Sequence, residues 1–417
     1  MKKRKIKVGV FGANRGMSMI NVMLKHPDAE LVAICDRYEP RLACCREISD
    51  KAGSRVAYYT DFDKFMNHDF EAVVLANYAT EHAPFAVRLL DSGRHVCSEV
   101  VACQTLGEAV ALVEAVERSK KIYAFAENYC YFRETAEMKR LYRKGDIGEF
   151  LYGEGEYVHD CGSIWTSITY GDKNHWRNWI PATFYCTHSM GPIVTVTQTR
   201  PVRISAYEMP NINTRKFGRR GGDGSVIVCQ MSNGAVVKII PWGNFKQDSI
   251  WYSIRGENGV METGRWTAHE NKLHVYTEKG KGKPSARSYV PSFPLENKIS
   301  KITSGHDGSD FYTMHYFLEA ILGRPGKEEV IDVYQALDMT LVGTLGWRSI
   351  VNGNVPLEVP DFRNKAIRNK YRNDNWCADP KYAGPRQSKI SCSSETIAIP
   401  DSVYKKQQNE FMKKQGS

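Results

Sequence analysis

Several features that would place a chain in a specialised class are missing from this 417-residue sequence. No apolar run reaches the roughly 18 to 20 residues that a membrane-spanning helix needs, so we expect no membrane partner. None of the eleven cysteines forms a C-x-x-C pair, which argues against a zinc site or a redox motif. The basic start, residues 1–5, leads through only six residues into a glycine turn, which favours a first strand over a signal peptide. We therefore expect a cytoplasmic protein with free thiols.

Motifs that read nucleic acids are missing as well, although the net charge is +10. Residues 363–417 hold 12 Lys and Arg against 5 Asp and Glu, so seven of the ten surplus positive charges lie in this segment. No helix-turn-helix, zinc finger or aromatic RNA-binding motif accompanies them. We expect residues 363–417 to be a basic C-terminal extension, either solvated or embracing another subunit, and we expect no nucleic-acid partner.

What is present is the pattern of a large globular protein with two domains. In residues 1–126, short β-branched apolar runs alternate with segments of helical character. The expected strands are residues 5–11, 30–35, 58–59, 72–76, 94–97 and 122–126, and the clearest helices are 17–25, 83–92 and 106–119. Strands separated by helices of about ten residues predict an α/β Rossmann domain with a doubly wound parallel sheet.

The turn after the first strand carries the chemistry of this domain. It has the form Gly12-x-Asn14-x-Gly16, one residue tighter than G-x-G-x-x-G, with Asn in place of the middle glycine. Asn tolerates positive φ better than other residues with a side chain, so the turn is feasible, although a generic βα turn is the alternative. Asp36 ends the second strand, where a carboxylate would bind both ribose hydroxyls and repel a 2′-phosphate. This favours NAD over NADP, whereas the neighbouring Arg37 could bind such a phosphate.

The second half of the chain predicts an α+β domain with a large open antiparallel sheet. Residues 225–231 and 235–240 flank an Asn-Gly turn and form an expected hairpin, and residues 253–262 repeat the device. Residues 310–323 and 333–352 are expected helices, and the second should pack back on the Rossmann domain. We place the domains at residues 1–126 and 127–362, followed by the extension 363–417.

The sequence resembles the Gfo/Idh/MocA oxidoreductases in the Gly12 turn and in residues 72–82 and 93–99. In that family a strand usually ends in Glu-Lys-Pro, and the lysine contacts substrate and cofactor. Here the tripeptide is Glu99-Val100-Val101, so the lysine is absent. The turn and the resemblance together imply an NAD site formed by Gly12, Asn14, Arg15, Gly16, Asp36, Arg37, Asn77, His82 and Glu99.

A narrower resemblance accounts for the missing lysine. The chain is similar to the family 109 glycoside hydrolases, NAD-dependent glycosidases typified by α-N-acetylgalactosaminidase, which also replace the lysine by an apolar residue. The similar segments are residues 127–131, 155–160, 185–192, 305–311, 332–336 and 359–362. The most specific of them is Thr187-His188-x-x-Gly191-Pro192.

The resemblance implies a reaction in which the sugar is oxidised only for part of the cycle. Removing a hydride from C3 gives a ketone that acidifies the C2 proton, a base takes that proton, and the glycosidic oxygen leaves by elimination. Water then adds and the ketone is reduced again. Tyr and His can hold and move such protons once neighbours shift their pKa values. The resemblance points to Tyr157 and His188 for these tasks, with Glu127 near the nicotinamide.

Further polar and aromatic residues are candidates for binding the sugar, each with a purely structural alternative. His159 and Asp160 form an orienting pair or a surface turn, and His306 and Asp310 line the pocket or start a helix. Trp176, with its neighbours in the stretch 165–181, stacks on a sugar or packs in a lid. The spacing of His159, His175 and His188 matches no metal-ligand pattern, so we expect no metal.

Three functions remain open at this point. The first is the NAD-dependent glycosidase, the second is a sugar or polyol dehydrogenase of the same family using NAD or NADP, and the third is a non-catalytic dinucleotide sensor. All three predict a homodimer or homotetramer, because one face of the sheet in this family often meets a neighbouring subunit. The first two predict a carbohydrate substrate, whose sugar and anomer the sequence does not name.

Overall fold

The computed structural model describes residues 4–266, 271–278, 282–295, 305–379, 382 and 398–415. The chain forms two compact units, and each is assembled from separate stretches. The first unit comprises Met1–Ala136, Ser292–Leu337 and Phe362–Asn373, and the second comprises Glu137–Pro291, Asp338–Asp361 and Asp374–Ser417. Residues 292–337, which the sequence placed in the second domain, thus belong with the Rossmann strands, since Phe125 N donates to Ile331 O over 2.9 Å.

The described part of the first unit holds a six-stranded sheet in the order β3-β2-β1-β4-β5-β6. Its strands are β1 (Ile6–Phe11), β2 (Ala29–Cys35), β3 (Ala57–Tyr59), β4 (Ala72–Leu75), β5 (His95–Ser98) and β6 (Tyr123–Phe125), and every pairing is parallel. The side chains of β4 are buried throughout, as expected for a strand covered on both faces. The order reverses beside β1, which confirms the predicted doubly wound sheet.

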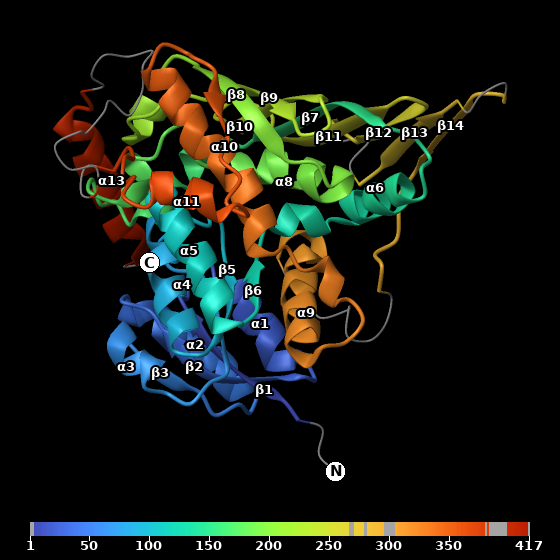
Figure 1. The fold of residues 1–417 in the computed structure, drawn as a ribbon. Helices are drawn as coiled ribbons and strands as arrows, with labels where there is room; N and C mark the ends of the chain where they lie inside the picture. Colours follow the sequence, from blue (N-terminus) through green and yellow to red (C-terminus); the bar gives the residue numbers. More distant parts are fainter. Residues whose placement is uncertain are drawn as a thin grey trace. The chain divides into compact units, whose positions relative to one another are not determined.

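Helices connect these strands and cover the sheet (Figure 1). They are α1 (Met17–Lys25), α2 (Glu39–Lys51), α3 (Phe62–Met66), α4 (His82–Asp91) and α5 (Leu106–Ser119), joined later in the chain by α9 (Ser309–Leu322), the start of α10 (Val333–Val351) and α11 (Lys365–Tyr371). The N-terminus of α5 is fixed by a capping box between Thr105 and Glu108. Its bounds match the sequence prediction for 106–119.

The second unit is built on a sheet that has nine strands in the described residues, ordered β14-β13-β12-β11-β7-β10-β9-β8-β15. The strands are β7 (Phe150–Val158), β8 (Pro201–Glu208), β9 (Ser225–Met231), β10 (Val236–Gly243), β11 (Ser249–Gly256), β12 (Gly259–Thr263), β13 (Leu273–Thr277), β14 (Ser285–Tyr289) and β15 (Leu357–Glu358). Both predicted hairpins are confirmed as antiparallel pairs. The pairing of β10 with β7 is parallel, so the sheet is mostly rather than wholly antiparallel.

Helix α8 (Cys186–Thr197) packs on one face of this sheet and is buried along its whole length. A glycine lets the two elements come close, because a Cβ on Gly155 of β7 would lie 2.1 Å from Ser189 O. Strand residues two apart point to the same face, so Gly153, Gly155 and Tyr157 all face α8. The close approach therefore brings Tyr157 to the first turn of the helix.

The basic C-terminal segment is not the extended tail that its sequence predicts. Its described part contains α11 in the first unit and α13 (Asp401–Gln415) in the second. Arg368 of α11 is 1% exposed and forms a bidentate pair with Glu117 at 2.6 and 2.7 Å. Tyr404 of α13 is buried and donates to Gly218 O over 2.8 Å. Neither contact could be predicted from the sequence, because a single buried arginine and a single buried tyrosine produce almost no hydrophobic periodicity.

Replacing Glu117 by Gln should destabilise the protein and flatten its acid unfolding. The hydrogen bonds from Arg368 lower the pKa of Glu117 from 4.5 to about 2. Stability from this pair is thus complete above about pH 4.5 and is lost as the pH falls toward 2. We expect Glu117→Gln to lose about 1–3 kcal/mol near pH 7, because Arg368 stays buried without its charged partner. Urea unfolding between pH 7 and 2.5 measures both effects, with the exposed Glu47→Gln as control. Parallel pH profiles for Glu117→Gln and the parent would contradict the prediction.

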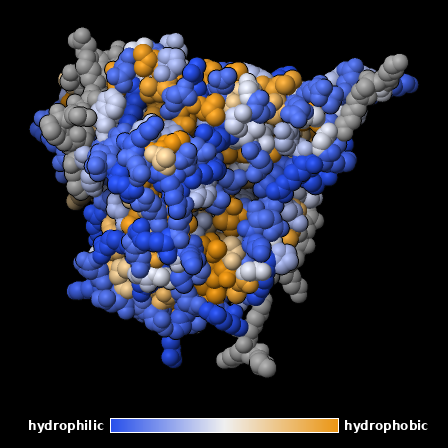
Figure 2. Space-filling model, viewed as in Figure 1, coloured by the Kyte–Doolittle hydropathy of each residue, from blue (hydrophilic) through white to orange (hydrophobic). Residues whose placement is uncertain are grey.

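Figure 2 shows hydrophobic residues in small groups between hydrophilic ones on the face it displays. In the parts of the chain that the structure describes, we find no helix long and apolar enough to cross a membrane.

Candidate active site

The glycine turn of the first unit has the shape that a dinucleotide requires. Gly12 follows β1 with φ +99°, and a Cβ there would lie 2.3 Å from the carbonyl of Ala76 at the end of β4. Only glycine fits this position. Gly16 is the N-cap of α1, so the turn presents the first backbone N–H groups of that helix. Asn14 is not among the residues with positive φ, so Gly12 alone meets the conformational demand that we had also assigned to Asn14.

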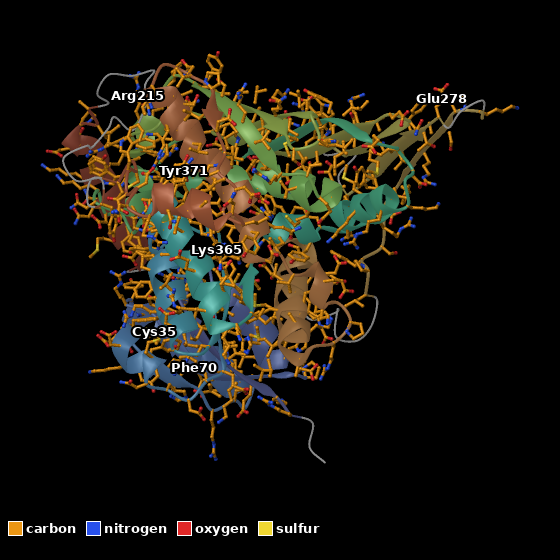
Figure 3. The ribbon with its side chains drawn as sticks, viewed as in Figure 1. Cys35, Phe70, Arg215, Glu278, Lys365 and Tyr371 are labelled. Atoms are coloured by element: carbon orange, nitrogen blue, oxygen red, sulfur yellow. The ribbon has the colours of Figure 1, made fainter. Side chains whose placement is uncertain are left out.

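Asp36 ties the end of β2 to this turn. Its carboxylate accepts hydrogen bonds from Ala13 N at 2.6 Å and from Tyr38 N at 2.8 Å. Asp36 follows Cys35, which Figure 3 labels at the end of the strand. The carboxylate is half-buried and keeps lone pairs for two ribose hydroxyls. Arg37 pairs instead with Glu81 at 2.8 Å and is mostly exposed, so its charge is already balanced in the protein.

Other predicted site residues follow the neighbouring strands β4 and β6: Asn77 and His82, predicted to bind the cofactor, and Glu127, predicted to be catalytic. Asn77 follows β4, and both polar atoms of its side chain are buried with no hydrogen-bond partner among the described residues. Such groups are costly unless a ligand satisfies them, and an amide or hydroxyl of a dinucleotide has the donors and acceptors to do so. His82 Nδ1 lies 3.0 Å from Val101 O, and Glu127, which follows β6, is fully buried and accepts from Tyr129 N. These residues fit a bound dinucleotide.

Arg15 is held by carboxylates of the protein. Its guanidinium forms a bidentate pair with Asp310 at 2.8 and 3.1 Å and a second pair with Glu99 at 2.8 Å. Asp310 is 0% exposed and also accepts from Ser18 at 2.6 Å and from His306 at 3.1 Å. Burial by itself would raise the pKa of Asp310, but the His306 hydrogen bond and the Arg15 charge hold it below its usual range.

This network changes the role that the sequence assigned to Asp310. Its carboxylate is occupied by protein donors, so the geometry makes it a positioning residue for the loop before α9 and for α1, where we had expected a sugar ligand. His306 is exposed, with φ +51°, and its ring lies 6.2 Å from that of Tyr129. A sugar-binding role for His306 stays a prediction.

In the second unit, Tyr157 and His188 form a close aromatic pair. Tyr157 is at the end of β7 and His188 is in the first turn of α8, with ring centroids 4.6 Å apart. The His188 carbonyl accepts from Tyr252 over 2.6 Å, which fixes the start of the helix. His188 is 9% exposed, so a proton could be exchanged in a largely dry environment. The structure thus brings together the two side chains that the resemblance assigned to proton transfer.

Tyr185 packs with Tyr157 and His188 and was not predicted from the sequence as a site residue. It precedes α8 as its N-cap, and its ring stacks on His188 at 5.9 Å with an interplanar angle of 5°. Burial raises the pKa of Tyr185, while the positive charge of Arg177 opposes that rise. The spacing of three residues, one turn of helix, was the signal that could have found it.

His159 and Asp160 lie beyond β7 but do not pair with each other. His159 Nδ1 is 2.9 Å from Asp248, and Asp160 binds Lys246 at 2.5 Å. Asp160 N also donates to Asp248 over 2.9 Å. Both residues therefore fasten the end of β7 to the loop before β11, which agrees with the surface-turn alternative.

Two of the three tryptophans in the stretch 165–181 are packed inward, and the third, Trp179, is half-buried. Trp165 is 2% exposed and stacks on Trp242 at 5.9 Å, so it belongs to the core. Trp176 is 7% exposed and lies against the ring of Phe184 and the guanidinium of Arg177. Among the described residues, no group of three or more His, Cys, Asp or Glu side chains is placed to hold a metal ion.

Comparison with known families gives matches to two parts of the chain. Residues 6–127 match the oxidoreductase family with an NAD-binding Rossmann fold, Gfo/Idh/MocA. Residues 209–369 match the C-terminal domain of glycosyl hydrolase 109. The chain joins a Gfo/Idh/MocA domain to a glycosyl hydrolase 109 domain. It is accordingly an NAD-dependent enzyme of the Gfo/Idh/MocA type, and its cofactor is NAD.

Relatives of this glycosyl hydrolase 109 type extend over most of the chain. A glycosyl hydrolase family 109 protein of Saccharopolyspora erythraea is 26% identical over 388 residues, which cover 86% of this chain and 83% of that protein. An alpha-N-acetylgalactosaminidase of Shewanella oneidensis is 24% identical, with 87% of this chain and 86% of that protein covered. Levoglucosan dehydrogenase in complex with NADH has the same fold, with a TM-score of 0.65, 18% identity and coverage of 86% of this chain and all of that chain.

One prediction arises from the geometry at Asp36. Replacing it by Ala removes the acceptor for the ribose and the two bonds that hold the turn. We expect NAD to bind roughly 10- to 100-fold more weakly, since hydrogen bonds to a charged group contribute about 1.5–3 kcal/mol. Fluorescence titration with NADH measures this. Arg37→Ala serves as control and should bind NADH as the parent does, because Glu81 already pairs with Arg37. NADPH binding in the parent that disappears in Arg37→Ala would show the opposite preference.

Proposed function

We propose that this enzyme cleaves glycosides without net oxidation, by transient oxidation at C3 of the sugar, elimination and re-reduction. The observation that carries the proposal is the Tyr157–His188 pair, with rings 4.6 Å apart, in a chain whose other unit has an NAD-binding fold. The position where oxidoreductases of this family place a lysine holds Val100, which is buried and has no protonatable group. Support also comes from relatives named glycosyl hydrolase family 109 proteins.

The proposed reaction is redox-neutral overall. The C3–H bond gives up its hydride and the C3 hydroxyl its proton, which leaves a ketone next to C2. The C2 proton passes to a base, the C1–O bond breaks, and the departing oxygen takes a proton. Water adds across the C1–C2 double bond, with hydroxyl at C1 and a proton at C2. The hydride then returns to C3, and the C3 oxygen takes back its proton. Bound NAD supplies the acceptor and then the donor for that hydride.

The chain's own residues supply the proton transfers. Tyr157 is the proposed base for the C2 proton, since it is half-buried and directly touches the imidazole of His188. His188 is the proposed partner that relays a proton to and from a hydroxyl. Glu127 is proposed to contribute from the end of β6, close to the residues that fit the dinucleotide.

Isotope labelling tests this proposal. Aryl α- and β-glycosides are incubated with the enzyme, with and without added NAD⁺, in deuterated water. Cleavage by elimination places deuterium at C2 of the released sugar and leaves no net NADH. Stoichiometric NADH without release of the aryl group would identify a dehydrogenase instead, and a lack of turnover with any sugar, despite tight NAD binding, would favour a sensor.

We also propose that the enzyme is a homo-oligomer through the sheet face opposite α8. The strand registers place Tyr207, Val228, Val236 and Tyr276 on that face, and these side chains are 59, 41, 42 and 38% exposed. Salt bridges such as Lys238–Glu154 lie between these apolar side chains. Two copies of the chain can bury such a face of apolar side chains and paired charges against each other. Light scattering should give a dimer or tetramer, and Val228→Glu should shift it toward the monomer. A monomeric parent would end this proposal.

A further inference from the structure

Three arginines stack on three tryptophans beside Tyr185. Arg177 lies over Trp176 at 4.3 Å, Arg220 over Trp179 at 3.6 Å, and Arg219 over Trp242 at 3.7 Å. We call these six residues the arginine–tryptophan cluster. Arg220 N donates to Asn178 O over 3.1 Å, and this bond joins residues 176–179 to residues 219–220. Trp242 meets the ring of Tyr185 at 6.0 Å, so the cluster adjoins the proposed proton-transfer residues.

Among the described residues, none of the three guanidinium groups forms an ion pair with a carboxylate, and only the more distant charges of Glu208 and Asp223 act on Arg219. The Nε atoms of Arg219 and Arg220 are buried without a hydrogen-bond partner there. Arg219 is 0% exposed, and its guanidinium donates to the carbonyls of Gly222 and Ile180. Burial lowers the pKa of Arg219 to about 9, so it still carries its charge at neutral pH. A buried charge without an ion-pair partner is costly, and such a group is a candidate for binding a charge of opposite sign.

The nearby carboxylates are engaged elsewhere. Asp223 accepts from the backbone N–H groups of residues 212–214, and Glu208 accepts from Gly222 N at 3.0 Å. Asp160 and Asp248 bind Lys246 and His159. These four carboxylates therefore hold loops in place, and the arginine–tryptophan cluster keeps a net positive charge. Arg177, Trp179 and Arg220 are half-buried, so a ligand can reach them, whereas Arg219 and Trp242 lie behind them.

We propose that the arginine–tryptophan cluster binds an anionic substituent, a carboxylate or a sulfate ester, on the sugar that this enzyme acts on. The inference rests on the proposed glycosidase function and narrows its substrate class to acidic glycosides. Guanidinium groups bind carboxylate and sulfate through paired N–H donors, and the tryptophan faces hold the guanidinium planes in place. Arg219 adds charge from behind without touching the ligand.

Binding of free sugars tests the inference apart from catalysis. Calorimetric titration compares a hexuronic acid, a 6-sulfated N-acetylhexosamine and their neutral counterparts, with NAD present. We expect at least one acidic sugar to bind about tenfold or more tightly than its neutral counterpart. Whichever acidic sugar shows that gain identifies carboxylate or sulfate as the group. Equal binding of acidic and neutral sugars would overturn the inference.

Variants assign the preference to the cluster. Arg220→Gln should remove most of the preference, and Arg220→Lys should restore part of it, because the charge returns without the paired donors. The matched control is Arg215→Gln, which removes the same charge from an exposed residue nearby in the chain (labelled in Figure 3) and should keep the preference. A preference that survives Arg220→Gln, in protein that melts as the parent does, would refute the assignment.

The two proposals fail in different ways. If aryl glycosides of neutral sugars are cleaved as fast as those of acidic sugars, the inference about the cluster is wrong. The proposed glycosidase function would still hold. Acidic sugars that bind in an Arg220-dependent manner, without cleavage of any glycoside, would support the cluster's role and end the glycosidase proposal.

Discussion

Replacing Tyr157 by Phe is expected to lower kcat for glycoside cleavage by about 10²- to 10⁴-fold, the range that a positioned acid or base contributes. The substitution removes one hydroxyl and keeps the ring that packs on His188 at 4.6 Å. The fold and the packing of α8 on β7 should therefore be unchanged. Steady-state rates on the best aryl glycoside measure the effect, and deuterium exchange at C2 of the bound sugar should fall by the same factor.

Two controls separate a chemical role for Tyr157 from a structural one. NADH binding should stay at the parent value, because the residues that fit the dinucleotide are in the other unit. Tyr152→Phe removes a hydroxyl from the same strand on the opposite sheet face and should leave kcat unchanged. Full turnover by Tyr157→Phe on a glycoside that the parent cleaves would show that another group is the base.

The second large effect is expected from Asp310→Ala, which we predict to lose about 3–5 kcal/mol of stability. The change leaves the half-buried Arg15 with Glu99 alone and frees Ser18 and His306 from their shared acceptor. Because Ser18 lies in α1, just after the glycine turn, affinity for NADH should fall as well. Urea unfolding and NADH titration measure the two consequences.

Asp307→Ala is the matched control for Asp310→Ala. Asp307 is exposed in the same turn and carries the same charge. Its removal should change stability by less than about 0.5 kcal/mol, as is usual for surface positions. Equal losses for the two variants, or a loss below about 1 kcal/mol for Asp310→Ala, would mean that the network around Arg15 does not support the turn.

The features that the sequence predicted well are local in the chain. Gly12 and Asp36 were found because a strand, a turn and a strand end follow one another within about twenty-five residues, and the geometry at Gly12 requires the residue type that stands there. The hairpin around Asn233-Gly234 was found for the same reason. In each case the physical demand and the residues that meet it are neighbours in the sequence.

The features that the sequence could not predict depend on partners far along the chain. Nothing near Arg15 indicates that its carboxylate partner stands 295 residues later. Arg368 has the appearance of a solvated charge until Glu117, 251 residues earlier, pairs with it. The arginine–tryptophan cluster is likewise assembled from three segments that are far apart in the sequence, residues 176–179, 219–220 and Trp242 of β10. Such pairings are set by tertiary structure, which hydrophobic periodicity does not encode.

The distance in sequence between Arg15 and Asp310 has a consequence during synthesis. The six strands of the Rossmann sheet leave the ribosome first, yet the aspartate that holds the glycine turn follows 295 residues later. At about 5–20 residues per second, Asp310 is translated roughly 15 to 60 s after Arg15. Before Asp310 is made, Glu99 is the carboxylate that can pair with Arg15. The glycine turn gains its second carboxylate contact only once α9 has been translated.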